Sequence, residues 1–160
     1  MVKIFLGCFI ITVCTAIGKK TTAKHKHKLS YYECLLSFNK ALKQNLQFKQ
    51  EDLLNLVNFD YKNQDFNASI SSFKLAKQNV FDYQELYYPE FLDKDDRAFL
   101  SNYFELLGKG NTKAEMENLV FYEELINEKV CKIADNCSKF SNLGQRLGFA
   151  VGMAVFIIIL

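Results

Sequence analysis

The 160-residue sequence has little proline and little glycine, so it contains few residues that interrupt helices. Its one proline is Pro89, and four of its seven glycines (Gly7, Gly18, Gly148 and Gly152) lie in or beside apolar segments at the chain ends. Leu, Lys, Asn, Glu and Phe dominate the part between those ends, a composition typical of helices. About 115 of these residues, 29–142, are left for a folded domain, enough for one small core. The sequence therefore predicts an all-α protein.

The motifs of common enzyme classes are missing. There is no glycine-rich phosphate loop followed by Lys-Ser or Lys-Thr, no GxSxG and no HExxH. The two histidines, His25 and His27, alternate with lysines, whose charges repel a divalent metal ion. They also make a poor general base. We therefore expect a protein that is not an enzyme and that binds no cofactor or metal.

The five cysteines show no spacing that would indicate a set of disulfide bonds. Cys8 and Cys14 lie in the first apolar segment, which leaves the odd set Cys34, Cys131 and Cys137 without CxxC spacing. This pattern predicts no disulfide framework and no zinc site. Reduced thiols in a cytoplasmic domain are the simplest interpretation.

Both chain ends are apolar. Residues 2–18 read VKIFLGCFIITVCTAIG with one charge, Lys3, and residues 147–160 read LGFAVGMAVFIIIL with none. About 17 helical residues span roughly 25 Å, which suffices for a thin bilayer. We therefore predict a transmembrane helix over residues 1–18 and another over residues 143–160.

Basic residues flank both apolar ends on their inner sides. The second end is preceded by Lys132, Lys139 and Arg146, and the first is followed by Lys19, Lys20, Lys24, Lys26 and Lys28. Such residues remain in the cytoplasm. The pattern predicts a hairpin with both termini outside and the middle inside. Residues 19–28 would form a basic juxtamembrane hinge that contacts anionic lipid headgroups.

The two ends also fit a second interpretation, a secreted and lipid-anchored surface protein. Residues 1–18 would then be a cleaved signal peptide, and the C-terminal apolar segment would be a lipid-anchor signal. Two sequons, at Asn67 and Asn136, agree with this alternative. The basic residues after the first segment favour the membrane-anchored interpretation instead.

Apolar periodicity predicts a cytoplasmic helical bundle over residues 29–142. Its helices would cover residues 30–46, 50–57 and 68–79, then a helix from Asp93 to Leu107, and a long helix from Asn111 or Thr112 onwards. Capping boxes would pair Ser30 with Glu33 and Thr112 with Glu115. Ile70, Phe73, Leu75 and Ala76 would face inwards in the third of these helices. In the last, the predicted apolar stripe comprises Met116, Leu119, Ile126, Val130, Ile133, Cys137 and Phe140.

Two groups of residues are candidates for contacts with other helices or proteins. Gly148 and Gly152 have the GxxxG spacing that lets membrane helices approach closely. The acidic run Asp93, Asp95 and Asp96 suits a helix N-terminus, with Asp93 as the N-cap. The candidates for partner-facing groups are Asp93, Asp95, Asp96, Glu115 and Glu117.

The order of these features resembles stage III sporulation protein AB of endospore-forming bacteria. The resemblance covers nearly the whole chain and is carried by KIFLGCFIITVCTAIGKK at the start, CLLSFNKAL in the first bundle helix, and the Asp93–Gly108 segment. It ends on Leu147, Gly148 and Gly152 in a closing membrane helix. The chain departs from the family pattern after Gly108, where Gly110, Asn111 and Glu115 replace the usual Ser-Asp and Gln.

The resemblance implies a membrane component of the complex that the mother cell builds facing the forespore. The soluble domain would be similar to the helical domain of type II secretion inner-membrane platform proteins. By that analogy it would couple a cytoplasmic ATPase to the other membrane subunits of a channel needed for endospore formation.

Overall fold

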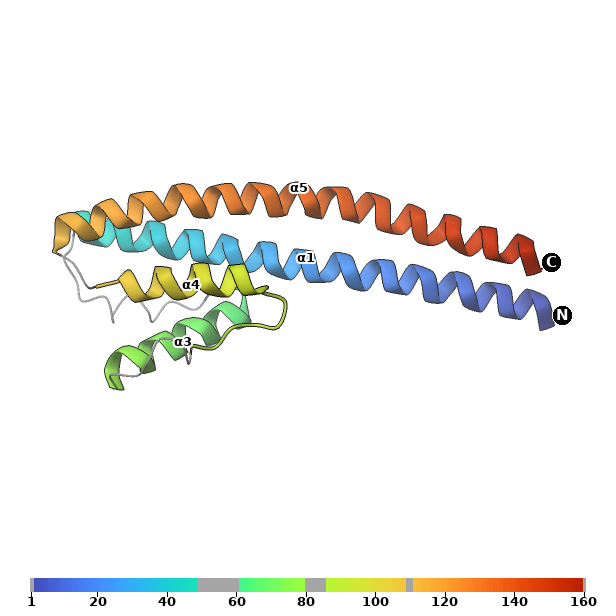
Figure 1. Cartoon of the computed structure of the whole chain (residues 1–160), viewed down its shortest axis with the longest axis horizontal. Coiled ribbons are helices and arrows are strands. Elements are labelled where there is room, and N and C mark those ends of the chain that lie inside the picture. The colour runs from blue at the N-terminus through green and yellow to red at the C-terminus, as the bar shows by residue number, and fades with distance from the viewer. Residues whose placement is uncertain (1, 49–60, 80–85, 109–110, 160) are drawn as a thin grey trace. The chain divides into compact units, whose positions relative to one another are not determined.

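A computed structural model describes residues 2–48, 61–79, 86–108 and 111–159. Within these residues the only regular elements are helices: α1 (Val2–Phe48), α3 (Gln64–Asn79), α4 (Lys94–Leu106) and α5 (Thr112–Ile159) (Figure 1). The predicted all-α class is confirmed. The helix predicted over residues 50–57 lies outside the described residues.

The chain divides into two compact units. One comprises Met1–Leu29 with Cys131–Leu160, and the other comprises Ser30–Val130. Helices α1 and α5 each contribute to both units. The second unit, here called the helical domain, begins one residue after the predicted start of the bundle and ends before the predicted limit at residue 142.

Helix α1 is continuous where the sequence analysis predicts a hinge and a new helix start. It runs from Val2 to Phe48, so residues 19–28 are helical and Ser30 is not an N-cap. A capping box requires a preceding residue outside the helix. Lysine is a good helix former and no proline occurs in this stretch, so nothing local ends the helix before Ser30.

Across the described part of the chain, no helix combines the length and the apolar character needed to cross a membrane. The two predicted transmembrane helices are therefore not confirmed. Gly148 and Gly152 both lie within α5, and their surroundings lie outside the described side chains.

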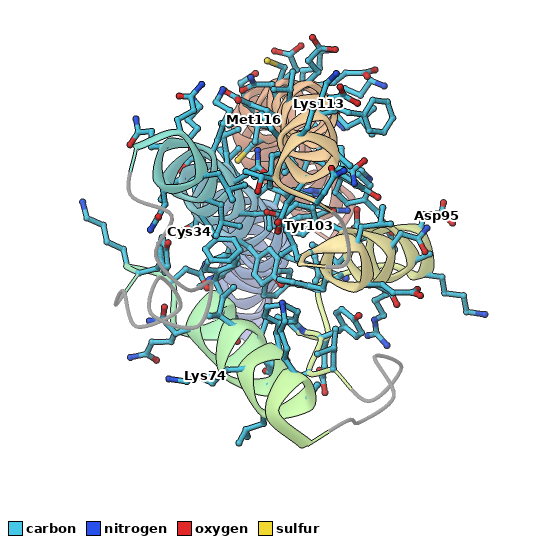
Figure 2. All side chains as sticks on the ribbon, turned by 90° about the vertical axis from the view of Figure 1, so that its left-hand side faces the viewer. Cys34, Lys74, Asp95, Tyr103, Lys113 and Met116 are labelled. Carbon is cyan, nitrogen blue, oxygen red and sulfur yellow. The ribbon has the colours of Figure 1, made fainter. Side chains whose placement is uncertain are left out.

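Each helix of the helical domain places one apolar face in a shared core. Figure 2 shows Tyr103 of α4 between the helices, while Lys74 of α3 and Asp95 of α4 point outwards. The largest fully buried side chains are Tyr31, Tyr32, Leu35, Phe38, Leu42, Phe66, Phe73, Leu100, Tyr103, Phe104, Leu119 and Ile126. The helical spacing of Tyr31, Cys34, Leu35, Phe38, Leu42 and Leu46 predicts one buried stripe on α1. The first five are buried as predicted, and Leu46 is half-buried.

Aromatic rings make up much of this core. Phe66 of α3 meets Tyr31 of α1 edge-on at 5.3 Å between ring centroids, and it meets Tyr61 at 5.0 Å. Phe73 of α3 lies 4.9 Å from Phe104 of α4. Such pairs stabilise the packing by about 0.5–1.5 kcal/mol each beyond the burial of their area. They join α3 to both α1 and α4.

Helix α3 corrects two predictions. It begins at Gln64, four residues before the predicted start, because the Asn63 side chain accepts a hydrogen bond from the Phe66 amide at 3.0 Å and caps the helix. Ile70, Phe73 and Ala76 are buried as predicted, but Leu75 is 58% exposed. Leu75 directly precedes the buried Ala76, and neighbouring positions on a helix face different directions.

Candidate functional site

The start of α4 carries the acidic run that the sequence analysis singled out. Asp93 is the N-cap, and its carboxylate accepts a hydrogen bond from the Asp96 amide at 2.9 Å. The Asp96 carboxylate accepts in return from the Asp93 amide at 3.3 Å. The predicted cap is confirmed, and it takes the form of a full capping box.

Asp96 connects three helices inside the domain. It is only 3% exposed, and its carboxylate accepts a hydrogen bond from the Tyr32 hydroxyl of α1 at 2.8 Å. The Lys129 ammonium of α5 lies 3.3 Å from the same oxygen. Lys129 also lies 4.8 Å from the centre of the Phe99 ring and 5.7 Å from that of Tyr32. A buried carboxylate is tolerated when it is paired in this way.

This arrangement fixes the protonation of Tyr32. Burial, followed by the negative charge of Asp96, raises the pKa of the Tyr32 hydroxyl far above its ordinary value. The hydroxyl therefore stays protonated and remains a donor to Asp96. Asp96 thus faces the interior of the domain and is not presented to a partner.

A second polar network crosses the core. The Asn39 amide group of α1 donates to the Leu119 carbonyl of α5 at 2.9 Å, and its oxygen accepts from the Tyr103 hydroxyl of α4 at 3.0 Å. Lys43 and Glu123 form an ion pair between α1 and α5. Burial raises the pKa of Tyr103 well above its ordinary value, so this hydroxyl also remains a donor. Both networks specify how α1, α4 and α5 pack.

The connection between α4 and α5 uses Glu115 and Gly108. Gly108 has a φ of 73°, the left-handed conformation typical of a helix C-terminus, and its amide donates to the Glu115 carboxylate at 2.9 Å. The Asn111 side chain accepts from the Ala114 amide at 2.8 Å. Asn111 is therefore the N-cap of α5, and the predicted Thr112–Glu115 capping box is wrong because Thr112 is already helical.

The five acidic candidates are not brought together in one site. Asp93 and Asp95 are exposed at the start of α4 (Asp95 is labelled in Figure 2), and Glu117 is exposed on α5. Glu115 is half-buried and Asp96 is buried. The exposed members therefore lie on two helices, Asp93 and Asp95 at the start of α4 and Glu117 on α5.

The predicted membrane-surface lysines lie on α1. Lys24 and Lys26 are exposed and Lys28 is half-buried. The side chains of Lys19 and Lys20 lie outside the described residues. In the part of the chain that the structure describes, no three His, Cys, Asp or Glu side chains are grouped as a metal site would require.

The described cysteines and Asn67 of the first sequon have structural roles or none that suggests a site. Cys34 and Cys137 are buried, Cys131 is exposed, and all three carry free thiols. The Asn67 side chain binds the backbone of Tyr61 twice, accepting from its amide at 2.9 Å and donating to its carbonyl at 2.8 Å. This side chain holds the chain before α3 in place, which disfavours a glycan on its nitrogen.

Sequence reasoning missed an apolar feature on the outer face of α5. Val120 and Phe121 are large, apolar and exposed, although they adjoin the buried Leu119 and Tyr122. The sequence does indicate this feature, because on a helix with 3.6 residues per turn Val120 and Phe121 lie on the side away from the predicted stripe of Leu119 and Ile126.

Comparison with known proteins agrees with the resemblance in the sequence. The family model of stage III sporulation protein AB matches residues 3–160. Neither the curated proteins nor the solved structures include one with significant similarity to the chain. Because the family model covers nearly the entire sequence, the chain belongs to the stage III sporulation protein AB family.

Proposed function

We propose that this chain is a non-enzymatic membrane component of the complex that connects the mother cell with the forespore during endospore formation. In this proposal the helical domain lies on the mother-cell cytoplasmic side and couples a cytoplasmic ATPase to the other membrane subunits. The observation that carries the proposal is the family match over residues 3–160. A match of that length includes both apolar ends as well as the domain between them.

The proposed membrane attachment rests on the sequence of the two ends. Residues 2–18 contain one charge and residues 147–160 contain none, and lysines follow the first segment directly. Positive charges next to an apolar segment favour the cytoplasmic side. Exposed Lys24 and Lys26 on α1 supply that charge at the surface of the chain.

The proposed role as a connector is supported by how the helical domain is built. Its buried polar groups are joined across helices, as in the contacts of Asp96 with Tyr32 and Lys129. Networks of this kind stabilise one packing arrangement of α1, α4 and α5. The exposed acidic residues then lie at defined positions on α4 and α5, as a subunit that contacts several partners requires.

The test is deletion of the gene in its spore-forming host, with a complemented strain as control. We expect the number of heat-resistant spores to collapse, with engulfment complete and late forespore gene expression absent. Normal spore counts would refute the proposal. Fractionation of sporulating cells, together with the intact mass of the purified chain, tests the membrane part. An uncleaved chain in the membrane fraction is expected, and a chain shortened at both ends would instead support a secreted, lipid-anchored protein.

A further inference from the structure

The outer face of α5 carries two exposed apolar side chains with an exposed glutamate on either side. Val120 is 44% exposed and Phe121 is 57% exposed. Glu117 and Glu124 are exposed three residues before Val120 and three residues after Phe121. Residues spaced by three, four and seven positions share one face of a helix. We name these four residues, Glu117, Val120, Phe121 and Glu124, the α5 outer stripe.

The packing of the domain does not account for the apolar members of this stripe. The residues of α5 that enter the core are Leu119, Tyr122 and Ile126, on the opposite face. Local helix stability does not account for Val120 and Phe121 either, because both residue types are poorer helix formers than Lys or Glu. Two adjacent exposed apolar side chains rimmed by acidic residues form a surface that a contact beyond the domain would bury.

Phe121 is also positioned for such a contact. Its ring meets the Tyr122 ring edge-on at 5.6 Å between centroids, and Tyr122 in turn packs 5.1 Å from the buried Tyr103. An aromatic side chain that is already held in place loses little conformational freedom on binding. Aromatic residues of this kind commonly contribute most of the binding energy at protein interfaces.

We propose that the α5 outer stripe docks an amphipathic segment of another protein, in which apolar residues are flanked by Lys or Arg. The argument is charge complementarity, because Glu117 and Glu124 frame the apolar pair on both sides. A second copy of the stripe would bring carboxylates against carboxylates. An anionic lipid surface would repel the same two residues. The proposal rests on the proposed function in one respect, namely that the docked segment belongs to a subunit of the same complex.

Site-specific photo-crosslinking of the full-length chain tests where the partner lies. A photoreactive phenylalanine analogue replaces Val120 in sporulating cells, and the crosslinked peptide is identified by mass spectrometry. Leu75 of α3 is the control, because at 58% it is at least as exposed as Val120 at 44%, but no aromatic or acidic neighbour frames it on its helix face. We expect one major crosslinked peptide at position 120, basic and amphipathic, and none of it at position 75.

A binding assay with defined peptides tests the chemistry. The probes are a synthetic helical peptide with alternating faces of Leu and Lys, and its counterpart in which Glu replaces Lys. Binding to the purified full-length chain in a nonionic detergent is followed by fluorescence anisotropy. We expect the Lys peptide to bind at least tenfold more tightly than the Glu peptide, and Phe121→Ala to weaken its binding at least tenfold.

Charge reversal provides the control. Glu117→Lys with Glu124→Lys is expected to invert the peptide preference, whereas Glu33→Lys with Glu90→Lys, at two exposed positions on other elements, changes the net charge equally and leaves the preference intact. Equal effects of the two double variants would overturn the proposal, as would a crosslink to lipid or to a second copy.

The two proposals fail separately in a spore assay. If the deletion strain makes no spores and the Phe121→Ala and charge-reversed chains both complement it fully, the docking proposal is wrong and the sporulation role stands. If the deletion strain makes normal spores, the proposed function is wrong, and the peptide assay still decides whether the stripe binds basic segments.

Discussion

The contact between Tyr32 and Asp96 offers the sharpest test of how the helical domain is held together. Tyr32→Phe removes the hydroxyl that donates to Asp96 at 2.8 Å. The Asp96 carboxylate keeps the Asp93 amide and Lys129 as partners, so it loses one stabilising contact and retains two. Hydrogen bonds to charged groups contribute about 1.5–3 kcal/mol. We expect Tyr32→Phe to lower the free energy of unfolding by about 2 kcal/mol.

Asp96→Ala should cost more, because it removes three interactions together. It leaves the Tyr32 hydroxyl buried without an acceptor, which costs about 1–3 kcal/mol. It also removes half of the capping box of α4, worth about 1 kcal/mol. The ion pair with Lys129 adds less than about 1 kcal/mol, since the Lys129 side chain is 31% exposed. The expected loss is about 3 kcal/mol.

The assay is urea unfolding of the full-length chain in nonionic detergent, followed by far-ultraviolet circular dichroism. The double variant completes a thermodynamic cycle, and we expect a coupling energy of about 1–2 kcal/mol between Tyr32 and Asp96. Lys129→Met measures separately how much the ion pair between Lys129 and Asp96 contributes to the free energy of unfolding. Single losses below about 0.5 kcal/mol, or additive effects in the double variant, would show that Asp96 is not the connection between α1 and α4.

Three further outcomes follow from the same structure. Asn39→Leu should destabilise the domain by about 2 kcal/mol, because the buried Tyr103 hydroxyl loses its acceptor; unchanged urea midpoints would contradict this. Gly108→Ala should cost about 1 kcal/mol in a thermal melt, since alanine is strained at a φ of 73°, and no change would show that the turn adjusts freely. Burial raises the pKa of Tyr31, Tyr32 and Tyr103 above the ordinary tyrosine value of 10.0, so the unfolded chain loses these protons first as pH rises. Stability is complete below pH 10.0 and should fall above it by up to about 1.4 kcal/mol per pH unit for each tyrosine; a titration with no steepening, or one unaffected by Tyr31→Phe, would refute this.

The sequence predicts structure correctly where the interacting residues belong to one helix and lie close together in the chain. The capping box of Asp93 and Asp96 was readable because donor and acceptor lie three residues apart. The apolar stripe of α1 was readable because its period is that of the helix, and Tyr31, Leu35 and Phe38 are buried as expected.

Cap spacing and apolar residue type gave wrong predictions at two positions, where the outcome depends on more than the local sequence. Ser30 and Glu33 have capping-box spacing, yet α1 passes through both, because the lysine-rich stretch before them contains no proline or glycine that would end a helix. Leu75 was expected inside and is exposed, since the partner helices cover only one side of α3. Residue type alone does not tell which side of a helix meets a neighbour.

The amino-acid sequence alone is enough to predict the helical class, the family and the acidic start of α4, because these follow from composition, apolar periodicity and residues close together in the chain. Which carboxylates become buried depends instead on how the helices pack. Asp95 remains at the surface, whereas Asp96, its neighbour in sequence, is buried against Tyr32 and Lys129. The physical reason is that adjacent residues of a helix point about 100° apart, so the packing of α1 and α5 against α4 selects which carboxylate is enclosed.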